Sequence, residues 1–488
     1  MSTASNQAID WRKTLFIFLG IGAFALFYFL PPLAPAVDPQ GKEFALSRQG
    51  QLAIGLFLLA GIWWVFEVIP IGVTSIMIGV VQAMFLIRPA SDAFRDFMDP
   101  SVMFIFGSLL LGLAFTKAGL TRRLAFKMLG VVGENTRMIL LGTFIVTAGL
   151  THLMAHTAVA ATMFPILLVI MSLYGEDERP TKFGKGLFIG MAYAAGAGSM
   201  CTMLGAARNP VAAGFYKEFT GNELTFLQLT KAMAPYGWAM VFIIWALIAF
   251  VFFKPERNTI PGLKERVGEM YKKLGPVSKQ EIFVALVAAA VVAVLALQNF
   301  IPALAQLNRS VPLLAAGILF FLTGLFTVED LEKKVPWNIV LLFSGAMSIG
   351  FALWQTGAAQ WMAVNWLTMF QNAPWLFFVA AIAFLVLVLT NFIMNVAAIA
   401  ITLPVALVIA NYLGVNSDLI LYTALAMAAL PFMLLVGAAP NAIAYQSKQF
   451  STGEFFLTGI PMSIVCLLLV VLFAVTIWPL LGIPALVR

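Results

Sequence analysis

The hydrophobic positions of this chain fall into long runs separated by short polar connections. Eleven runs are long enough, at roughly 20 residues each, to cross the hydrocarbon core of a bilayer. They lie near residues 14–30, 51–69, 71–90, 100–118, 187–215, 232–253, 282–300, 310–327, 337–356, 416–445 and 456–482. A β-barrel would instead show short segments of alternating hydrophobicity. The pattern therefore predicts an all-α polytopic membrane protein with about 11 transmembrane helices.

Two further apolar runs, 138–172 and 376–411, are interrupted by polar groups at their midpoints. The interruptions lie at His156-Thr157 and at Asn395-Val396. Each run has room for two half-length helices, so we expect a re-entrant hairpin in each rather than a full crossing. Non-helical backbone at this depth is tolerated only where protein or a watery cavity surrounds it. The two hairpin tips therefore predict a cavity inside the membrane.

The tips belong to a motif that occurs twice. Residues 151–165 read THLMAHTAVAATMFP, and about 239 residues later 390–404 read TNFIMNVAAIAITLP. A second pair follows, GAARNPVAAG at 205–214 and GAAPNAIAYQ at 437–446, so each half also carries an Asn-containing break in an apolar segment. Two polar interruptions in each half, in the same order, are typical of a transport site near the middle of the membrane.

The order of spans predicts that the two copies are inverted relative to each other. Each repeat unit holds five crossings and one hairpin, and an odd number of crossings reverses the second copy. The connection after the first unit's leading span contains Arg122, Arg123, Lys127 and Arg137, whereas 357–374 in the second unit contains no charge. The positive-inside bias makes the first connection cytoplasmic and the second external.

This topology divides the chain into four parts. They are an N-terminal span and external loop (1–50), a first inverted repeat (51–253), a cytoplasmic linker rich in Lys and Arg (254–281) and a second inverted repeat (282–488). We expect an integral protein of the bacterial inner membrane, with the bilayer around its spans and the N-terminus in the cytoplasm.

Composition agrees with this class and excludes others. The chain is 61% hydrophobic and only 10% charged, and its mean hydropathy is +0.96. The net charge of +7 comes from Lys and Arg between the spans, so nucleic-acid binding is not expected. Cys201 and Cys466 lie in apolar segments and indicate neither a disulfide nor a metal site. No Walker lysine motif is present, and the tips carry no catalytic pair, so we expect neither ATP-driven transport nor an enzyme.

The tips and breaks resemble those of the divalent-anion/sodium symporter family, whose members move dicarboxylates, citrate or sulfate. The tips read Ala155-His156-Thr157 and Met394-Asn395-Val396, and the breaks run from Gly205 to Asn209 and from Gly437 to Asn441. The resemblance covers nearly the whole chain. It implies two sodium sites that bracket the anion, an elevator-like movement and a homodimer, with no cofactor other than Na⁺ as the coupling ion.

By resemblance, the first cation site involves Thr151, Ala155, His156 and Gly205, and the second Thr390, Ile393, Asn395 and Gly437. The anion is expected against His156, Thr157 and Asn395, beside the backbone of Ala206, Ala207, Ala438 and Ala439. A hairpin tip suits both ions, because helix ends expose amides with partial positive and carbonyls with partial negative charge.

Two residues depart from the family pattern and leave alternatives open. His156 replaces an amide, and it stands four residues after His152, which we expect on the same helix face. The pair could be packing residues, His156 could contact substrate or couple protons, and a zinc pair would lack further ligands. Arg208 could pair with a carboxylate such as Glu67, or it could contact the substrate or gate the site. If both side chains face the cavity, their charge could replace a bound sodium.

The sequence therefore predicts a secondary active transporter of small organic anions, with C4-dicarboxylates as the leading class and sodium as the coupling ion. The alternatives are an anion exchanger, a proton-coupled carrier, a sulfate or sulfonate permease, and an anion receptor that does not transport.

Overall fold

The computed structural model describes residues 11–37, 42–66, 68–174, 180–298, 300–367, 374–392 and 394–487. Its contacts divide the chain into two compact units, one formed by residues 1–99 with 337–371 and the other by 100–336 with 372–488. Both hairpin tips and both Asn-containing breaks lie in the second unit. This division is not the division into repeats, whose boundaries stay a prediction.

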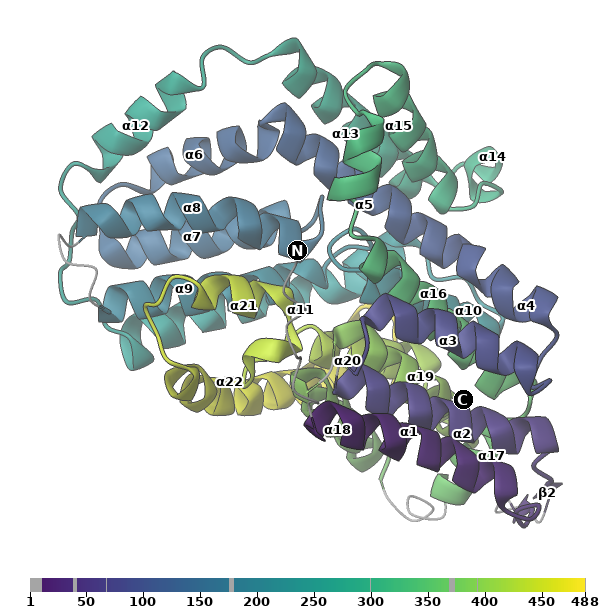
Figure 1. Cartoon of the computed structure of the whole chain (residues 1–488). Coiled ribbons are helices and arrows are strands. Elements are labelled where there is room, and N and C mark those ends of the chain that lie inside the picture. The colour runs from purple at the N-terminus through teal and green to yellow at the C-terminus, as the bar shows by residue number, and fades with distance from the viewer. Residues whose placement is uncertain are drawn as a thin grey trace, which may run out of the picture. The chain divides into compact units, whose positions relative to one another are not determined.

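The first unit is built from membrane helices with one small hairpin of strands (Figure 1). Its elements are α1 (Trp11–Phe29), β1 (Ala36–Val37), β2 (Glu43–Phe44), α2 (Arg48–Val65), α3 (Ile71–Met84), α4 (Ala90–Arg95), η1 (Asp96–Met98), α16 (Trp337–Gln355) and α17 (Ala358–Leu367). Helix α2 packs on α1, and α3 packs between α2 and α16. A buried ion pair between Arg88 and Asp96, at 2.6 Å, lies inside this unit, and Gln355 accepts a further hydrogen bond from Arg88.

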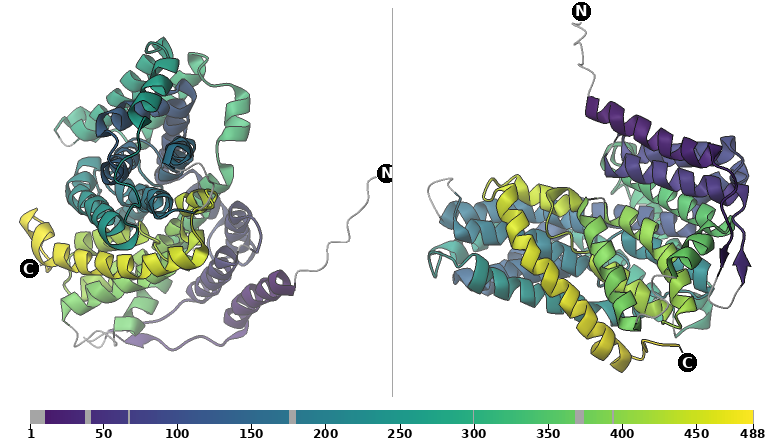
Figure 2. Two further views of the ribbon diagram at one scale, coloured as in Figure 1. Left: turned by 90° about the vertical axis from the view of Figure 1, so that its left-hand side faces the viewer. Right: turned by 90° about the horizontal axis from the view of Figure 1, so that it is seen from below.

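The second unit holds the remaining helices. Its elements are α5 (Pro100–Ala118), α6 (Leu120–Val132), α7 (Thr136–Leu150), α8 (His156–Tyr174), α9 (Lys182–Ser199), α10 (Arg208–Thr220), α11 (Phe226–Leu247), η2 (Ile248–Phe252), α12 (Leu263–Lys273), α13 (Lys279–Leu297), α14 (Pro302–Ala305), α15 (Ser310–Leu322), η3 (Asp330–Lys334), α18 (Trp375–Phe392), α19 (Asn395–Tyr412), α20 (Ser417–Ala428), η4 (Leu435–Gly437), α21 (Ala439–Tyr445), α22 (Thr452–Leu472), η5 (Phe473–Ile477) and α23 (Trp478–Leu480). Helices α7, α8 and α9 run side by side in Figure 1, and the long α22, yellow in Figure 2, packs against α18.

The predicted fold class is confirmed. Among the described residues, eight helices are long and apolar enough to cross a membrane, and five shorter apolar helices accompany them. The predicted spans 187–215 and 416–445 are each interrupted in the structure. The first is broken between the end of α9 and the start of α10, and the second between α20 and α21. These interruptions are the two breaks that the sequence repeats.

Both predicted hairpin runs form two helices joined by a short tip. Helices α7 and α8 have 15 and 19 residues, and α18 and α19 have 18 each, so all four are longer than the half-length helices we expected. The Asn135 side chain caps α7 by accepting hydrogen bonds from the backbone of Arg137 and Met138. The tips thus lie at the meeting of well-formed helix ends, where backbone groups lack helical partners.

Candidate functional site

The first tip is fastened to the first break by backbone contacts. Helix α8 begins at His156, whose backbone N–H donates to the carbonyl of Gly205 at 3.0 Å. A Cβ atom at position 205 would lie 2.6 Å from the carbonyl oxygen of Thr151, which is a repulsive distance. Only glycine therefore lets the break approach the tip this closely. Thr151 is fully buried, and its hydroxyl donates to the carbonyl of Ala148 at 2.6 Å.

The second tip meets the second break in a similar way. Asn391 accepts hydrogen bonds from the backbone N–H groups of Met433 and Leu434, at 2.8 and 3.3 Å. A Cβ atom at Gly437 would lie 2.7 Å from the carbonyl oxygen of Thr390. Each tip is thus joined to the break that follows it in the sequence.

An asparagine side chain braces each break from within. The amide nitrogens of Asn209 and Asn441 each donate to two backbone carbonyls, ten and seven residues earlier in both cases. The acceptors are Ser199 and Thr202 in the first half, at 2.9 and 2.6 Å, and Pro431 and Leu434 in the second, at 2.8 and 3.1 Å. The repeated Gly-x-x-x-Asn pattern therefore encodes a repeated local structure.

A small cavity brings residues of the two halves together. His156 of the first tip lines it with Ala438, Pro440 and Asn441 of the second break, and its other walls come from α9 and residues 429–432. Its volume is about 10 Å³, room for a single water molecule. Sites for small organic ligands measure roughly 300–1,000 Å³. A four-carbon anion can therefore enter only if the tip and break separate.

The predicted substrate residues are only partly gathered at this cavity. His156 and Ala438 line it, whereas the others are not among its lining residues. The others are Thr157, Ala206, Ala207, Arg208, Asn395 and Ala439. Asn395 begins α19 and accepts a hydrogen bond from the hydroxyl of Thr390 at 3.1 Å. Helix α19 also packs against α10, which follows the first break. Helix α19, which begins at the second tip, thus lies beside α10, which follows the first break. In the same way, His156 at the first tip lies beside the second break.

The predicted cation residues form two clusters. The first joins Thr151, His156 and Gly205 through the contacts described above. The Ala155 carbonyl already accepts the N–H groups of Ala158 and Val159, at 2.9 and 3.2 Å. The second cluster joins Thr390 with Asn395 and Gly437. Its fourth predicted member, Ile393, lies outside the described residues.

His152 does not share a helix face with His156, so that expectation is wrong. Helix α7 ends at Leu150, before His152, and α8 begins only at His156. The tip between the two helices breaks the four-residue periodicity on which the expectation rested. His152 instead accepts a hydrogen bond from the Trp238 indole N–H at its Nε2 atom, at 3.2 Å, and packs edge-on against that ring. This is a packing role.

Arg208 is a buried cation with few partners. It is 1% exposed, and its Nη2 atom donates to the Ser199 hydroxyl at 2.7 Å. Its Nε and Nη1 atoms have no hydrogen-bond partner in the described part of the chain. Among the residues that the structure describes, no carboxylate forms an ion pair with Arg208. Glu67, the expected alternative partner, lies outside them. Such a charge is costly inside a membrane protein unless something compensates it.

Sequence reasoning missed two contributors to this region. Ser199 was not singled out, although it supplies both the acceptor for Arg208 and a carbonyl for Asn209. Asn391 was assigned no role, although its side chain accepts hydrogen bonds from the backbone of the second break. For Asn391 the available signal was its place in the repeated tip motif, where it aligns with His152.

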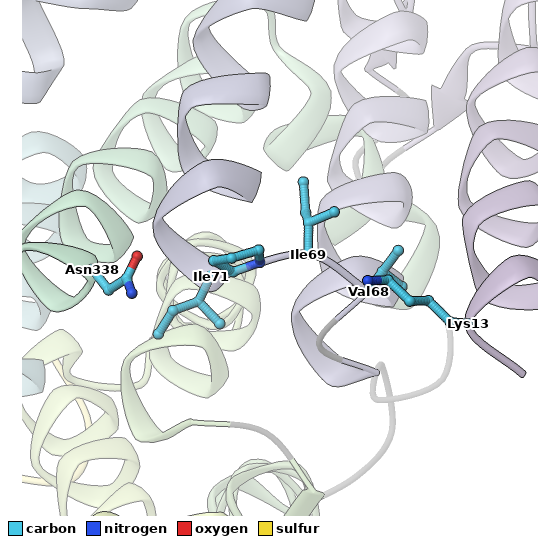
Figure 3. Close-up of a pocket in the computed structure, with 6 residues that line it drawn as sticks. Lys13, Val68, Ile69, Ile71 and Asn338 are labelled. Atoms are coloured by element: carbon cyan, nitrogen blue, oxygen red, sulfur yellow. The ribbon is translucent and has the colours of Figure 1, made fainter. Parts of the chain in front are cut away.

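Another cavity lies in the other unit (Figure 3). It has a volume of about 360 Å³, and Lys13 and Asn338 lie on opposite sides of Ile69 and of Ile71, the first residue of α3. None of the predicted site residues lines it. It therefore adds nothing to the transport site.

Comparison with known proteins supports the resemblance seen in the sequence. The dicarboxylate transporter SdcS of Staphylococcus saprophyticus, named sodium-dependent, is 25% identical over 90% of this chain and 88% of its own length. A membrane protein of Cupriavidus necator is 27% identical over 91% of this chain and 90% of its own. Among solved structures, the YdaH transporter of Alcanivorax borkumensis matches with a TM-score of 0.57 at 13% identity, covering 97% of this chain and 99% of its own.

The family comparison covers almost the entire sequence. Residues 35–484 match the model described as the sodium:sulfate symporter transmembrane region. The match includes both tips, both breaks and every predicted span except the first. The chain therefore belongs to the sodium:sulfate symporter family, the divalent-anion/sodium symporters that its tips and breaks resemble.

Proposed function

We propose that this protein carries C4-dicarboxylates across a membrane by secondary active transport coupled to sodium. The observation that supports this most directly is the second-half cluster, in which Thr390, Asn395 and Gly437 lie together. Oxygen donors such as a hydroxyl, an amide and a carbonyl are the ligands that hard cations prefer. The relatives named as sodium-dependent dicarboxylate transporters support the same substrate and ion.

The anion is bound between the tips and breaks in this proposal. His156 and Thr157 contribute from the first tip and Asn395 from the second. The backbone beside Ala206, Ala207, Ala438 and Ala439 lets the anion approach closely. The cavity walls are mostly apolar, with Leu430 and Phe432 among them. Such walls favour a substrate with a hydrocarbon body over sulfate, which is hydrated on all sides.

Movement is proposed to be of the elevator type. Both tips and both breaks belong to one compact unit, so the binding residues can travel together. The matched braces at Asn209 and Asn441 support inverted repeats as the source of the two halves. A homodimer in the bacterial inner membrane, with a cytoplasmic N-terminus, completes the proposal. Cysteine accessibility at residue 13 in intact cells tests the orientation, and native mass spectrometry tests the dimer.

The transport proposal is tested in proteoliposomes that contain the purified full chain. Uptake of radiolabelled succinate is measured under an inward sodium gradient and with choline in place of sodium. We expect sodium to drive accumulation, unlabelled fumarate or malate to compete, and sulfate to compete weakly. Uptake that ignores succinate but accumulates sulfate would refute the substrate assignment.

Anion exchange is the second candidate, and Arg208 favours it. A sodium ion leaves the transport site with the substrate, whereas the charge of Arg208 stays in the site when it returns empty. A site with an unpaired positive charge should cross the membrane slowly, so an anion carried in the opposite direction would accelerate its return. Succinate loaded inside the vesicles distinguishes the candidates, because an obligate exchanger takes up label only in its presence and shows no response to sodium.

A further inference from the structure

Arg208 and Ser199 form a pair that exists in one half of the molecule only. In the second half, Pro440 occupies the position of Arg208, immediately before the asparagine of the break. Pro431 occupies the position of Ser199, whose carbonyl accepts the hydrogen bond of that asparagine. The two prolines cannot carry a charge or donate from a side chain. The asparagine hydrogen bonds are equivalent in the two halves, so the halves differ here in the positive charge of Arg208.

The guanidinium is linked to the first cation cluster through Ser199. Its hydrogen-bond partner is the Ser199 side chain, and the Ser199 carbonyl contacts the place where a Cβ of Gly205 would lie. Gly205 in turn contacts the carbonyl of Thr151 and accepts from the backbone of His156.

Two features make this place unsuitable for a sodium ion. His156 stands where the family pattern has an amide oxygen, and imidazole is a softer ligand than sodium prefers. A permanent positive charge beside the cluster repels a second cation, and the repulsion is strong where water is excluded. The second cluster has neither feature, since it keeps Asn395 and has a proline in place of the arginine.

We propose that Arg208 permanently supplies the positive charge of the first cation site, so that this chain binds sodium only at the second half and transports with one sodium ion fewer than a carrier with two intact sites. The number of sodium ions transported with each substrate rests on the proposed function. The number of sodium ions bound does not, because it can be measured without substrate. The Nε and Nη1 atoms of Arg208 have no acceptor among the described residues, so no counter-charge there neutralises the guanidinium.

Sodium binding is measured on the purified full chain, without substrate. Thermal stability is followed as sodium replaces choline at constant ionic strength. We expect the wild type to show non-cooperative stabilisation by sodium, and Asn395→Ala to lose that stabilisation. Cooperative binding of two sodium ions by the wild type would overturn the proposal. So would a sodium response that survives in Asn395→Ala, or a wild type that binds no sodium.

Charge variants provide the matched comparison. Arg208→Gln should gain a second sodium ion, seen as cooperative stabilisation and as one more sodium per succinate in reversal-potential measurements on proteoliposomes. Arg208→Lys and Ser199→Ala keep the charge and should keep the wild-type sodium number. An unchanged sodium number in a folded Arg208→Gln would overturn the proposal. If that variant does not fold, the wild-type and Asn395→Ala titrations decide. A wild type that binds sodium but carries no dicarboxylate would refute the proposed function alone.

Discussion

Replacing Asn395 with alanine separates binding from stability. Among the described residues the Asn395 side chain accepts one hydrogen bond, from the Thr390 hydroxyl, and that hydroxyl also donates to the Ala428 carbonyl at 3.0 Å. The hydroxyl therefore keeps an acceptor in Asn395→Ala, and the stability cost is about 1 kcal/mol. If the amide also contacts sodium and anion, the variant loses a charge-assisted contact worth about 1.5–3 kcal/mol. Apparent affinity then falls about 10- to 150-fold.

Asn391 is the matched control, because it is the same residue type at the end of the preceding helix. Its side chain accepts from two backbone N–H groups, those of Met433 and Leu434, and donates to the Leu387 carbonyl at 2.7 Å. Asn391→Ala leaves those two half-buried N–H groups without their acceptor, at up to about 1–3 kcal/mol each. We therefore expect this variant to lose stability, whereas Asn395→Ala loses uptake.

The assay compares the two variants at equal amounts of folded protein. Melting temperature and size-exclusion profile report folding, and initial rates of sodium-driven succinate uptake report function. Asn395→Ala with wild-type uptake would refute the binding role of the second tip. A large drop in its melting temperature would instead show that the amide supports the fold and that its contact with Thr390 contributes more than about 1 kcal/mol to stability.

Three further outcomes follow from the geometry. Gly437→Ala places a Cβ 2.7 Å from the Thr390 carbonyl, so sodium affinity should fall at least about tenfold in a sodium titration of uptake. His152→Phe leaves the Trp238 indole without its acceptor and should cost about 1–3 kcal/mol in denaturant unfolding, with uptake per folded protein unchanged. The ammonium of Lys117 holds the pKa of Asp330 well below its usual range. Asp330 therefore stabilises the fold fully above the ordinary carboxylate pKa of about 4, and this is lost as pH falls below it. Acid titration of the melting temperature should show that loss in the wild type and not in Asp330→Asn.

Much of the fold could be predicted because the bilayer imposes it. A span must be long, apolar and helical, so the runs in the sequence identify the helices almost directly. The hairpin runs 138–172 and 376–411 match α7 with α8 and α18 with α19 closely for the same reason. The helices are longer than expected, since hydropathy marks a run but does not set how far helical hydrogen bonding continues into its ends.

The side-chain contacts at the site could not be predicted to the same degree. His152 and His156 looked like neighbours on one face, and a single short tip between two helices removed that relation. Ser199 carried no signal because an isolated serine in an apolar run is common, and only its contact with Arg208 gives it meaning. Periodicity describes a continuous helix. It says nothing about residues at a place where the helix stops.

The two asparagine braces have a thermodynamic consequence. Asn209 and Asn441 hold their breaks through hydrogen bonds inside the protein, so both breaks are ordered before any ligand arrives. Binding of an anion beside them therefore does not have to order the backbone of the breaks. The conformational entropy cost of binding comes from the tips. Hydrogen exchange should therefore be slow in the breaks of the empty carrier and ligand-dependent in the tips. The breaks then select among anions by how well each anion fits their existing shape, and not by how strongly it orders them.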